Sequence, residues 1–121
     1  MQDYRRLKVS PRARAHAVAI RKCTQRFPRS GYADLKKQIT TAAESILFNI
    51  VEGCGSRTQK DFARFLDISI KSAFELEGQL ELATDYAIIP QAKSVTLCNE
   101  TVEIRKMLCT LRRRVIESDD Y

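Results

Sequence analysis

Apolar residues return at helical spacing along most of the chain, and this repeat constrains the fold more than any other feature. In the clearest segment, small or aliphatic residues recur every three or four positions: Leu35, Ile39, Ala42, Ile46, Ile50 and Gly53. Such a segment has one face that can pack closely against neighbouring helices. No stretch alternates between apolar and polar residues for long enough to compete as a strand. The chain is therefore predicted to be all-α.

Helix end signals divide the chain into four predicted helices. Ser10 followed by Pro11 is typical of a helix start, with serine as the N-cap and proline at the first helical position. Thr58 with Asp61 three residues later resembles a capping box. The predicted helices cover residues 10–27, 32–52, 58–87 and 91–117.

Four helices with short connections pack most simply as an up-down-up-down antiparallel four-helix bundle. The 121 residues are expected to form one domain, 1–121, with a short N-terminal arm at 1–10 and a frayed acidic tail at 118–121. The fourth helix carries a second apolar stripe, which predicts a homo-oligomer, although the stripe could instead pack against two neighbours in the monomer. Its members are Val95, Cys98, Val102, Cys109 and Ile116.

Positive charge is concentrated in the first quarter of the chain. The formal net charge is +6, whereas residues 1–30 carry nine basic residues against one acid, Asp3, which gives 9 − 1 = +8. Because few neighbouring acids compensate this charge, the basic side chains are expected to contact nucleic-acid phosphates; a solvated helix face is the other interpretation. The predicted nucleic-acid-binding residues are Arg5, Arg6, Lys8, Arg12, Arg14, Arg21, Lys22, Arg26, Arg29, Arg112, Arg113 and Arg114.

Two polar residues, Asn49 and Glu52, stand on one flank of the second helix just before a glycine turn. Gly53 and Gly55 are expected to adopt the left-handed conformation that ends a helix. The polar pair could bind a ligand or RNA, but a carboxylate among aliphatic residues repels phosphate. Asn49, Glu52 and Gly53 are therefore predicted to be structural or interface residues, with the polar pair forming a buried link.

Catalytic and metal-binding patterns are missing from the sequence. The only histidine, His16, has no acidic residue at helical spacing, which a dinuclear metal site in a bundle would require. Glu75, Glu77 and Glu81 are expected to be a solvated acidic patch, since nothing in the sequence pairs them with a base. The protein is therefore predicted not to be an enzyme and to hold no metal or cofactor.

The four cysteines, Cys23, Cys54, Cys98 and Cys109, lack the spacing of a zinc site or a redox pair. They are expected to be mostly buried thiols in a reducing compartment, with Cys54 in the glycine turn the most exposed. No apolar run approaches the roughly 20 residues that span a bilayer, and none follows the basic N-terminus as in a signal peptide. The expected location is the cytoplasm, without membrane contact.

Residues 38–83 resemble the signature of a known family, Q-I-x-x-A-x-x-S-I-x-x-N-I-x-E-G, followed by a basic turn, a phenylalanine-rich helix start and S-x-x-E-L-E-x-x-L. Tyr4, Leu7, Lys8 and Val9 resemble the family's opening. The family comprises four-helix bundle proteins encoded by intervening sequences in bacterial 23S rRNA genes, sometimes labelled S23 ribosomal protein. The matching signature residues are Gln38, Ile39, Ala42, Ser45, Ile46, Asn49, Ile50, Glu52, Gly53, Phe62, Phe65, Leu66, Ser72, Glu75, Leu76, Glu77 and Leu80.

This resemblance implies a homopentamer of four-helix protomers that acts as a non-enzymatic, nucleic-acid-binding accessory protein. Accessory variability determinant proteins of diversity-generating retroelements resemble the family in fold, and they are basic pentameric barrels that bind nucleic acid and a reverse transcriptase. The leading hypothesis is an oligomer that presents repeated basic faces to RNA or DNA backbones. The alternative is a protein scaffold that docks a reverse transcriptase.

Overall fold

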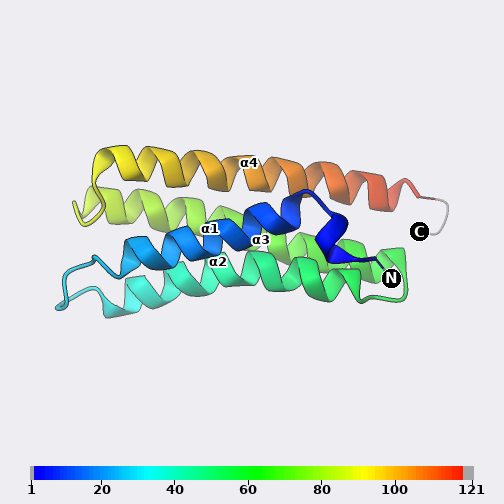
Figure 1. The fold of residues 1–121 in the computed structure, drawn as a ribbon, viewed down its shortest axis with the longest axis horizontal. Helices are drawn as coiled ribbons and strands as arrows, with labels where there is room; N and C mark the ends of the chain where they lie inside the picture. Colours follow the sequence, from blue (N-terminus) through cyan, green and yellow to red (C-terminus); the bar gives the residue numbers. More distant parts are fainter. Residues whose placement is uncertain (1, 119–121) are drawn as a thin grey trace.

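The computed structural model describes residues 2–118 as an antiparallel four-helix bundle (Figure 1). Each helix reverses the direction of the preceding one, so the first and last described residues lie at the same end of the bundle. This confirms the predicted all-α, up-down-up-down fold, and no strand occurs within residues 2–118. The elements are the short 3-10 helix η1 (Tyr4–Arg6), α1 (Val9–Thr24), α2 (Ala33–Cys54), α3 (Gln59–Asp85) and α4 (Gln91–Ile116).

The two ends of the chain differ from the prediction. Part of the predicted arm folds as η1, which packs on α1 and α2, and α1 already begins at Val9. Ser10 is therefore not the N-cap but a buried residue in the first turn. Pro11 stands at the third helical position instead of the predicted first, and it is tolerated there because the first four helical N–H groups have no partner within the helix. Of the predicted frayed tail, residues 119–121 lie outside the described part of the chain.

The corner between α2 and α3 is tighter than the sequence indicated. Gly53 lies inside α2 and Gly55 has a φ of −80°, so neither adopts the predicted left-handed conformation. Gly53 instead allows α3 to approach, because a Cβ at this position would lie 2.9 Å from Phe62 Cδ1. The predicted cap of α3 is confirmed, since the side chain of Thr58 accepts a hydrogen bond from the N–H of Asp61 at 3.1 Å.

The corner between α3 and α4 is a Schellman turn centred on Ala87, whose φ is +61°. Ile88 N–H donates to the Ala83 carbonyl at 3.1 Å, and Ala87 N–H donates to the Thr84 carbonyl at 2.9 Å. Both bonds satisfy carbonyls that the end of α3 would otherwise leave free. A non-glycine residue in this left-handed position carries strain, because its Cβ crowds the following carbonyl.

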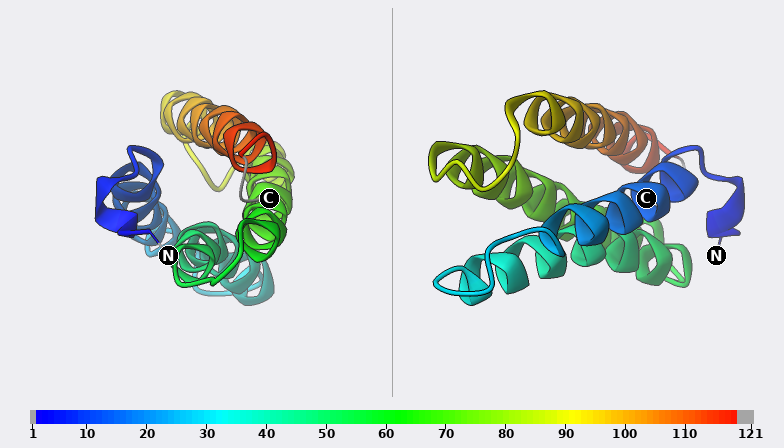
Figure 2. Two further views of the ribbon diagram at one scale, coloured as in Figure 1. Left: turned by 90° about the vertical axis from the view of Figure 1, so that its right-hand side faces the viewer. Right: turned by 60° about the vertical axis from the view of Figure 1, so that its left-hand side comes forward.

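Viewed end-on, the helices follow one another around the bundle, so α1 and α4 are neighbours on the closing side (Figure 2). Contact between α1 and α4 is less extensive than contact between α2 and α3. The core enclosed by the four helices is mostly aliphatic, and each helix contributes at least one of its largest fully buried side chains. The contact between α1 and α4 is therefore the place in the bundle where polar and charged side chains can lie between two helices.

The predicted second stripe on α4 is only partly covered in the protomer. Cys98 and Ile116 pack against the core, whereas Val95 is half exposed and Cys109 is exposed. Cys54 was predicted to be the most exposed cysteine, which is wrong. It is still within α2, it is buried, and its carbonyl accepts a hydrogen bond from the Gln2 N–H of the N-terminal arm at 2.9 Å.

Candidate nucleic-acid interface

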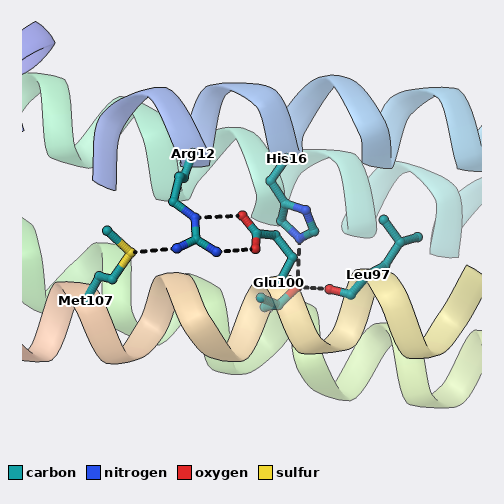
Figure 3. Close-up of polar contacts among 6 residues, drawn as sticks. Arg12, His16, Leu97, Glu100 and Met107 are labelled. Atoms are coloured by element: carbon teal, nitrogen blue, oxygen red, sulfur yellow. Dashed lines mark hydrogen bonds and ion pairs between the residues drawn. The ribbon is translucent and has the colours of Figure 1, made fainter. Parts of the chain in front are cut away.

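Arg12 and Glu100 form the central contact between α1 and α4 (Figure 3). Arg12 Nε donates to Oε2 of Glu100 at 3.1 Å, and Nη2 donates to Oε1 at 2.5 Å. The third guanidinium nitrogen, Nη1, lies 3.4 Å from Met107 Sδ. This two-point hydrogen bonding raises the pKa of Arg12 and fixes its side chain in one orientation. Arg12, a predicted phosphate-binding residue, is thus already engaged within the protomer.

His16 lies one turn further along α1 and is buried against α4 (Figure 3). Its Nε2 is 2.7 Å from Thr101 Oγ1, and that hydroxyl donates its only hydrogen to the Leu97 carbonyl at 2.8 Å. Nε2 must therefore carry the hydrogen and donate to Thr101. Burial lowers the pKa of His16 to about 4, against a smaller opposing effect of Glu100. The ring is a neutral packing residue at pH 7.

Three more of the predicted basic residues also have acidic partners, and two of these partners lie on other helices. Arg21 contacts Glu44 of α2 at 3.0 Å, and Arg112 pairs with Asp67 of α3. Arg5 lies 3.5 Å from Asp3 within the N-terminal arm. The expectation that few acids compensate the basic residues 10–27 is thus wrong for Arg12 and Arg21 alone, whose partners are 88 and 23 residues away in sequence, so that only folding brings them together. These partly exposed pairs contribute little stability but reduce the local charge.

A cavity of about 460 Å³, here named the wide pocket, opens on one side of the Arg12–Glu100 contact. It lies between the N-terminal arm, the start of α1 and the second half of α4. Apolar side chains of Leu7, Val9, Met107 and Leu111 line it together with Thr110. Four basic residues against a single acid, Glu103, make its lining positive: Arg6, Lys8, Lys106 and Arg114.

A second cavity of about 290 Å³, here named the narrow pocket, lies on the other side of the same contact. Cys23 at the end of α1 and Ile88 and Pro90 before α4 supply its apolar lining. The described residues that line it include no acid but three basic side chains: Lys22, Arg26 and Lys93. We call the two pockets and the contact between them the α1–α4 seam. The seam gathers positive charge at both ends and neutralises it in the middle.

Sequence reasoning missed two basic members of this seam, Lys93 and Lys106. A signal for one of them was present, because Lys93, Glu100, Met107 and Arg114 follow one another at seven-residue spacing and so share one face of α4. On this face, Glu100 and Met107 contact Arg12 of α1. Lys93 lines the narrow pocket and Arg114 lines the wide pocket.

The remaining predicted basic residues, Arg14, Arg29 and Arg113, are exposed and line neither pocket. Within residues 2–118, no group of three or more His, Cys, Asp or Glu side chains could hold a metal ion. The same residues include no helix of the length and apolar character needed to cross a membrane.

A family model described as 23S rRNA-intervening sequence protein matches residues 5–110. The chain belongs to this family. The resemblance noted from the signature residues is thereby confirmed. A search of curated proteins found no match to the chain.

A crystal structure of a family protein from Bacteroides thetaiotaomicron VPI-5482 has the same fold, with a TM-score of 0.81. It is described as a protein with unknown function from the S23 ribosomal protein family. The two sequences are 27% identical, and the match covers 86% of this chain and 97% of the other. Neither description mentions a retroelement or a reverse transcriptase, so that alternative stays a prediction.

The family's signature residues Asn49 and Gly53 lie near the contact between α2 and α3, away from the seam. Asn49 Nδ2 donates to the carbonyl and the hydroxyl of Ser45 at 2.8 and 3.0 Å, and Ser45 Oγ lies 2.7 Å from Ser72 Oγ on α3. Glu52 is exposed, so the predicted buried link does not include it in the protomer. The structural or interface role of Asn49, Glu52 and Gly53 stays a prediction.

The predicted acidic patch on α3 is also corrected by the structure. Glu77 accepts a hydrogen bond from Arg105 Nε at 2.6 Å, and both side chains are about four-fifths buried. Arg105 also lies over the ring of Phe74 at 4.4 Å from its centroid. Glu75 and Glu81 remain exposed as expected. Glu77, another signature residue, therefore joins α3 to α4 and does not belong to a solvated patch.

Proposed function

We propose that this family member is a non-enzymatic, basic protein that binds RNA or DNA through the phosphate backbone along its α1–α4 seam. The observation that carries the proposal is the composition of the two pockets, whose basic side chains outnumber the single acid Glu103. Within residues 2–118 no ion pair involves Lys8, Lys22 or Lys93, so these pocket lysines keep their charge uncompensated. A polyanion such as a nucleic-acid backbone can bind to these unpaired cations on one face of the bundle.

We further propose that the protein acts as a homo-oligomer, with a pentamer as the expected state. Large apolar side chains remain exposed on the outer faces of the bundle, among them Phe48, Ile68 and Val95. Apolar surface of this kind favours contact with further subunits. Repeating the seam in several copies would multiply the phosphate contacts. A mass measurement in dilute solution tests this part, and a stable single protomer would contradict it.

The seam is tested by removing its charge at the narrow pocket while keeping side-chain length. In the triple variant Lys22→Gln, Arg26→Gln and Lys93→Gln, affinity for duplex DNA should fall and become less dependent on salt. Each lost phosphate contact reduces the slope of log K against log salt by about 0.9, so the slope should fall by about 2 to 3. The side chains are exposed, so the fold should be unaffected.

A matched control removes three exposed lysines from α2 and α3, outside both pockets. This variant has the same net charge as the test variant, so any difference between the two reports the position of the charge. The slope of log K against log salt should change in this variant by less than about 0.9, the value of one phosphate contact. Equal slopes in the two variants, or no salt-dependent binding by the natural protein, would refute the proposal. The control substitutions are Lys36→Gln, Lys60→Gln and Lys71→Gln.

A further inference from the structure

The wide pocket combines two kinds of surface that a bare phosphate backbone does not require together. Lys8 and Lys106 supply positive charge, whereas Leu7, Met107 and Leu111 supply apolar area. Charge alone is sufficient to hold the outside of a duplex, where phosphates are exposed and base faces are stacked inside. An apolar lining inside a cationic site fits a ligand that offers an anion and an apolar face at once.

The narrow pocket repeats this combination at the other end of the seam. Lys22, Arg26 and Lys93 surround an apolar lining made of Cys23, Ile88 and Pro90. The two cavities, about 460 and 290 Å³, are close to the range of about 300–1,000 Å³ that small-molecule sites occupy. A single nucleotide fits a space of this size, whereas the body of a duplex is too wide to enter it. The same pairing of chemistry at two separate sites indicates one ligand class for both.

We infer that the two pockets receive unpaired nucleobases, so the α1–α4 seam selects single-stranded over duplex nucleic acid. This inference rests on the proposed function and names the form of nucleic acid that the seam takes. Single strands splay their bases out, and proteins hold such bases on aromatic or apolar side chains or on guanidinium planes beside a basic path for the backbone. The described lining of the two pockets supplies apolar side chains and guanidinium groups for this purpose and no aromatic ring. The pockets lie on either side of the Arg12–Glu100 contact, so one strand crosses that contact between them.

The lining of the wide pocket is held in place before any ligand arrives. Met107 Sδ lies 3.4 Å from Arg12 Nη1, and Arg12 is itself held by two hydrogen bonds to Glu100. The flexible thioether is thus fixed at the edge of the pocket, where a sulfur can make favourable contact with an aromatic base. The pair in the middle of the seam therefore orders the apolar surface as well as joining the helices.

The experiment compares three DNA probes of equal length with the full chain at the same salt concentration. They are a single strand, the same strand annealed to its complement, and a single strand with stable abasic sites throughout. The abasic strand keeps the charge and flexibility of the backbone but has no bases. The intact single strand should bind at least ~10-fold tighter than either of the others, a difference of about 1.4 kcal/mol, because only its bases are free to enter the two pockets.

A pocket-filling variant, Thr110→Phe, places the effect in the wide pocket without changing charge. Thr110 is exposed, lines this pocket, and donates its hydroxyl only to the Lys106 carbonyl of its own helix at 3.1 Å. The matched control is Thr96→Phe, because Thr96 is also exposed on α4, bonds to the Ala92 carbonyl at 3.2 Å, and lines neither pocket. Thr110→Phe should change single-strand binding several-fold, because the new ring either occludes the pocket or stacks on the base, whereas Thr96→Phe should leave single-strand binding unchanged.

The possible outcomes separate this inference from the proposed function. Equal affinity for the intact strand, the abasic strand and the duplex would overturn the inference while leaving backbone binding in place. Equal effects of the two phenylalanine variants would overturn it as well, because the pocket would then not be where bases bind. Absence of binding to all three probes at low salt would remove the proposed function itself.

Discussion

His16 makes the stability of this bundle dependent on pH, and the structure gives the sign and size of the effect. The ring is 4% exposed and donates through Nε2 to Thr101 Oγ1. Arg12 and Glu100, the nearest charged pair, are one turn away across the α1–α4 contact. Burial lowers the pKa of His16 from 6.5 to about 4 in the folded protein. The unfolded chain therefore binds a proton in a pH range where the folded chain does not.

The free energy of unfolding must fall as the pH is lowered through this range. The contribution is fully present above pH 6.5, falls progressively below it, and is lost by about pH 4. A difference of 2.5 pKa units corresponds to about 3 kcal/mol in total, because one unit is worth about 1.4 kcal/mol. Between about pH 7.5 and pH 5 the loss should be about 2 kcal/mol.

The variant His16→Gln tests this calculation, because glutamine can still donate a hydrogen bond to Thr101 but does not titrate. Urea unfolding of both proteins, at one fixed protein concentration, should show that only the natural protein loses this additional 2 kcal/mol or so. The control Thr101→Val removes the acceptor, so it should lower stability by about 1–2 kcal/mol at every pH and keep the pH dependence. If the glutamine variant loses as much stability as the natural protein between these pH values, His16 is not buried and neutral, and the reasoning is refuted.

Three further predictions follow from the backbone and the thiols. Gly53→Ala should destabilise the protein by about 1–3 kcal/mol, because the new Cβ would meet Phe62. Gly78→Ala places its Cβ in open space and should stabilise α3 by about 0.5–1 kcal/mol. If urea titrations show that both variants change the free energy of unfolding in the same direction, the close approach of α2 and α3 at Gly53 is contradicted. Ala87→Gly should raise stability by about 0.5–1 kcal/mol by relieving the left-handed φ, and a lower unfolding midpoint would show that this strain is absent. Cys109, the exposed thiol, should react first with a water-soluble disulfide reagent, so Cys109→Ser should remove the fast phase of the reaction and no other.

Local and periodic features of the fold could be predicted from the sequence because they depend on residues close together in the chain. The inner face of α2 follows from its repeat of apolar residues, and Ile39, Ile46 and Ile50 are all fully buried. The cap formed by Thr58 and Asp61 was equally predictable, since its two members are three residues apart.

Two of the failures concern features that depend on a second helix. Gly53 looked like a helix end because glycine is common there, and only the position of Phe62 shows that it serves close packing instead. Arg12 looked like an uncompensated charge because its partner, Glu100, is 88 residues away in sequence. Long-range ion pairs leave no mark in the local spacing of either member, so a count of charges along one helix overstates the positive surface.

The bundle separates the residues that define its fold from the residues proposed to bind nucleic acid. Asn49 and Gly53 lie near the contact between α2 and α3, which is the more extensive one, whereas the pockets lie on the less extensive closing side between α1 and α4. Exposed lysines such as Lys22 and Lys93 contribute little to stability. Their replacement should therefore change binding before it changes folding, whereas replacement at Gly53 should do the reverse. The charge of the seam, rather than the signature residues, is therefore the feature to change when binding is tested.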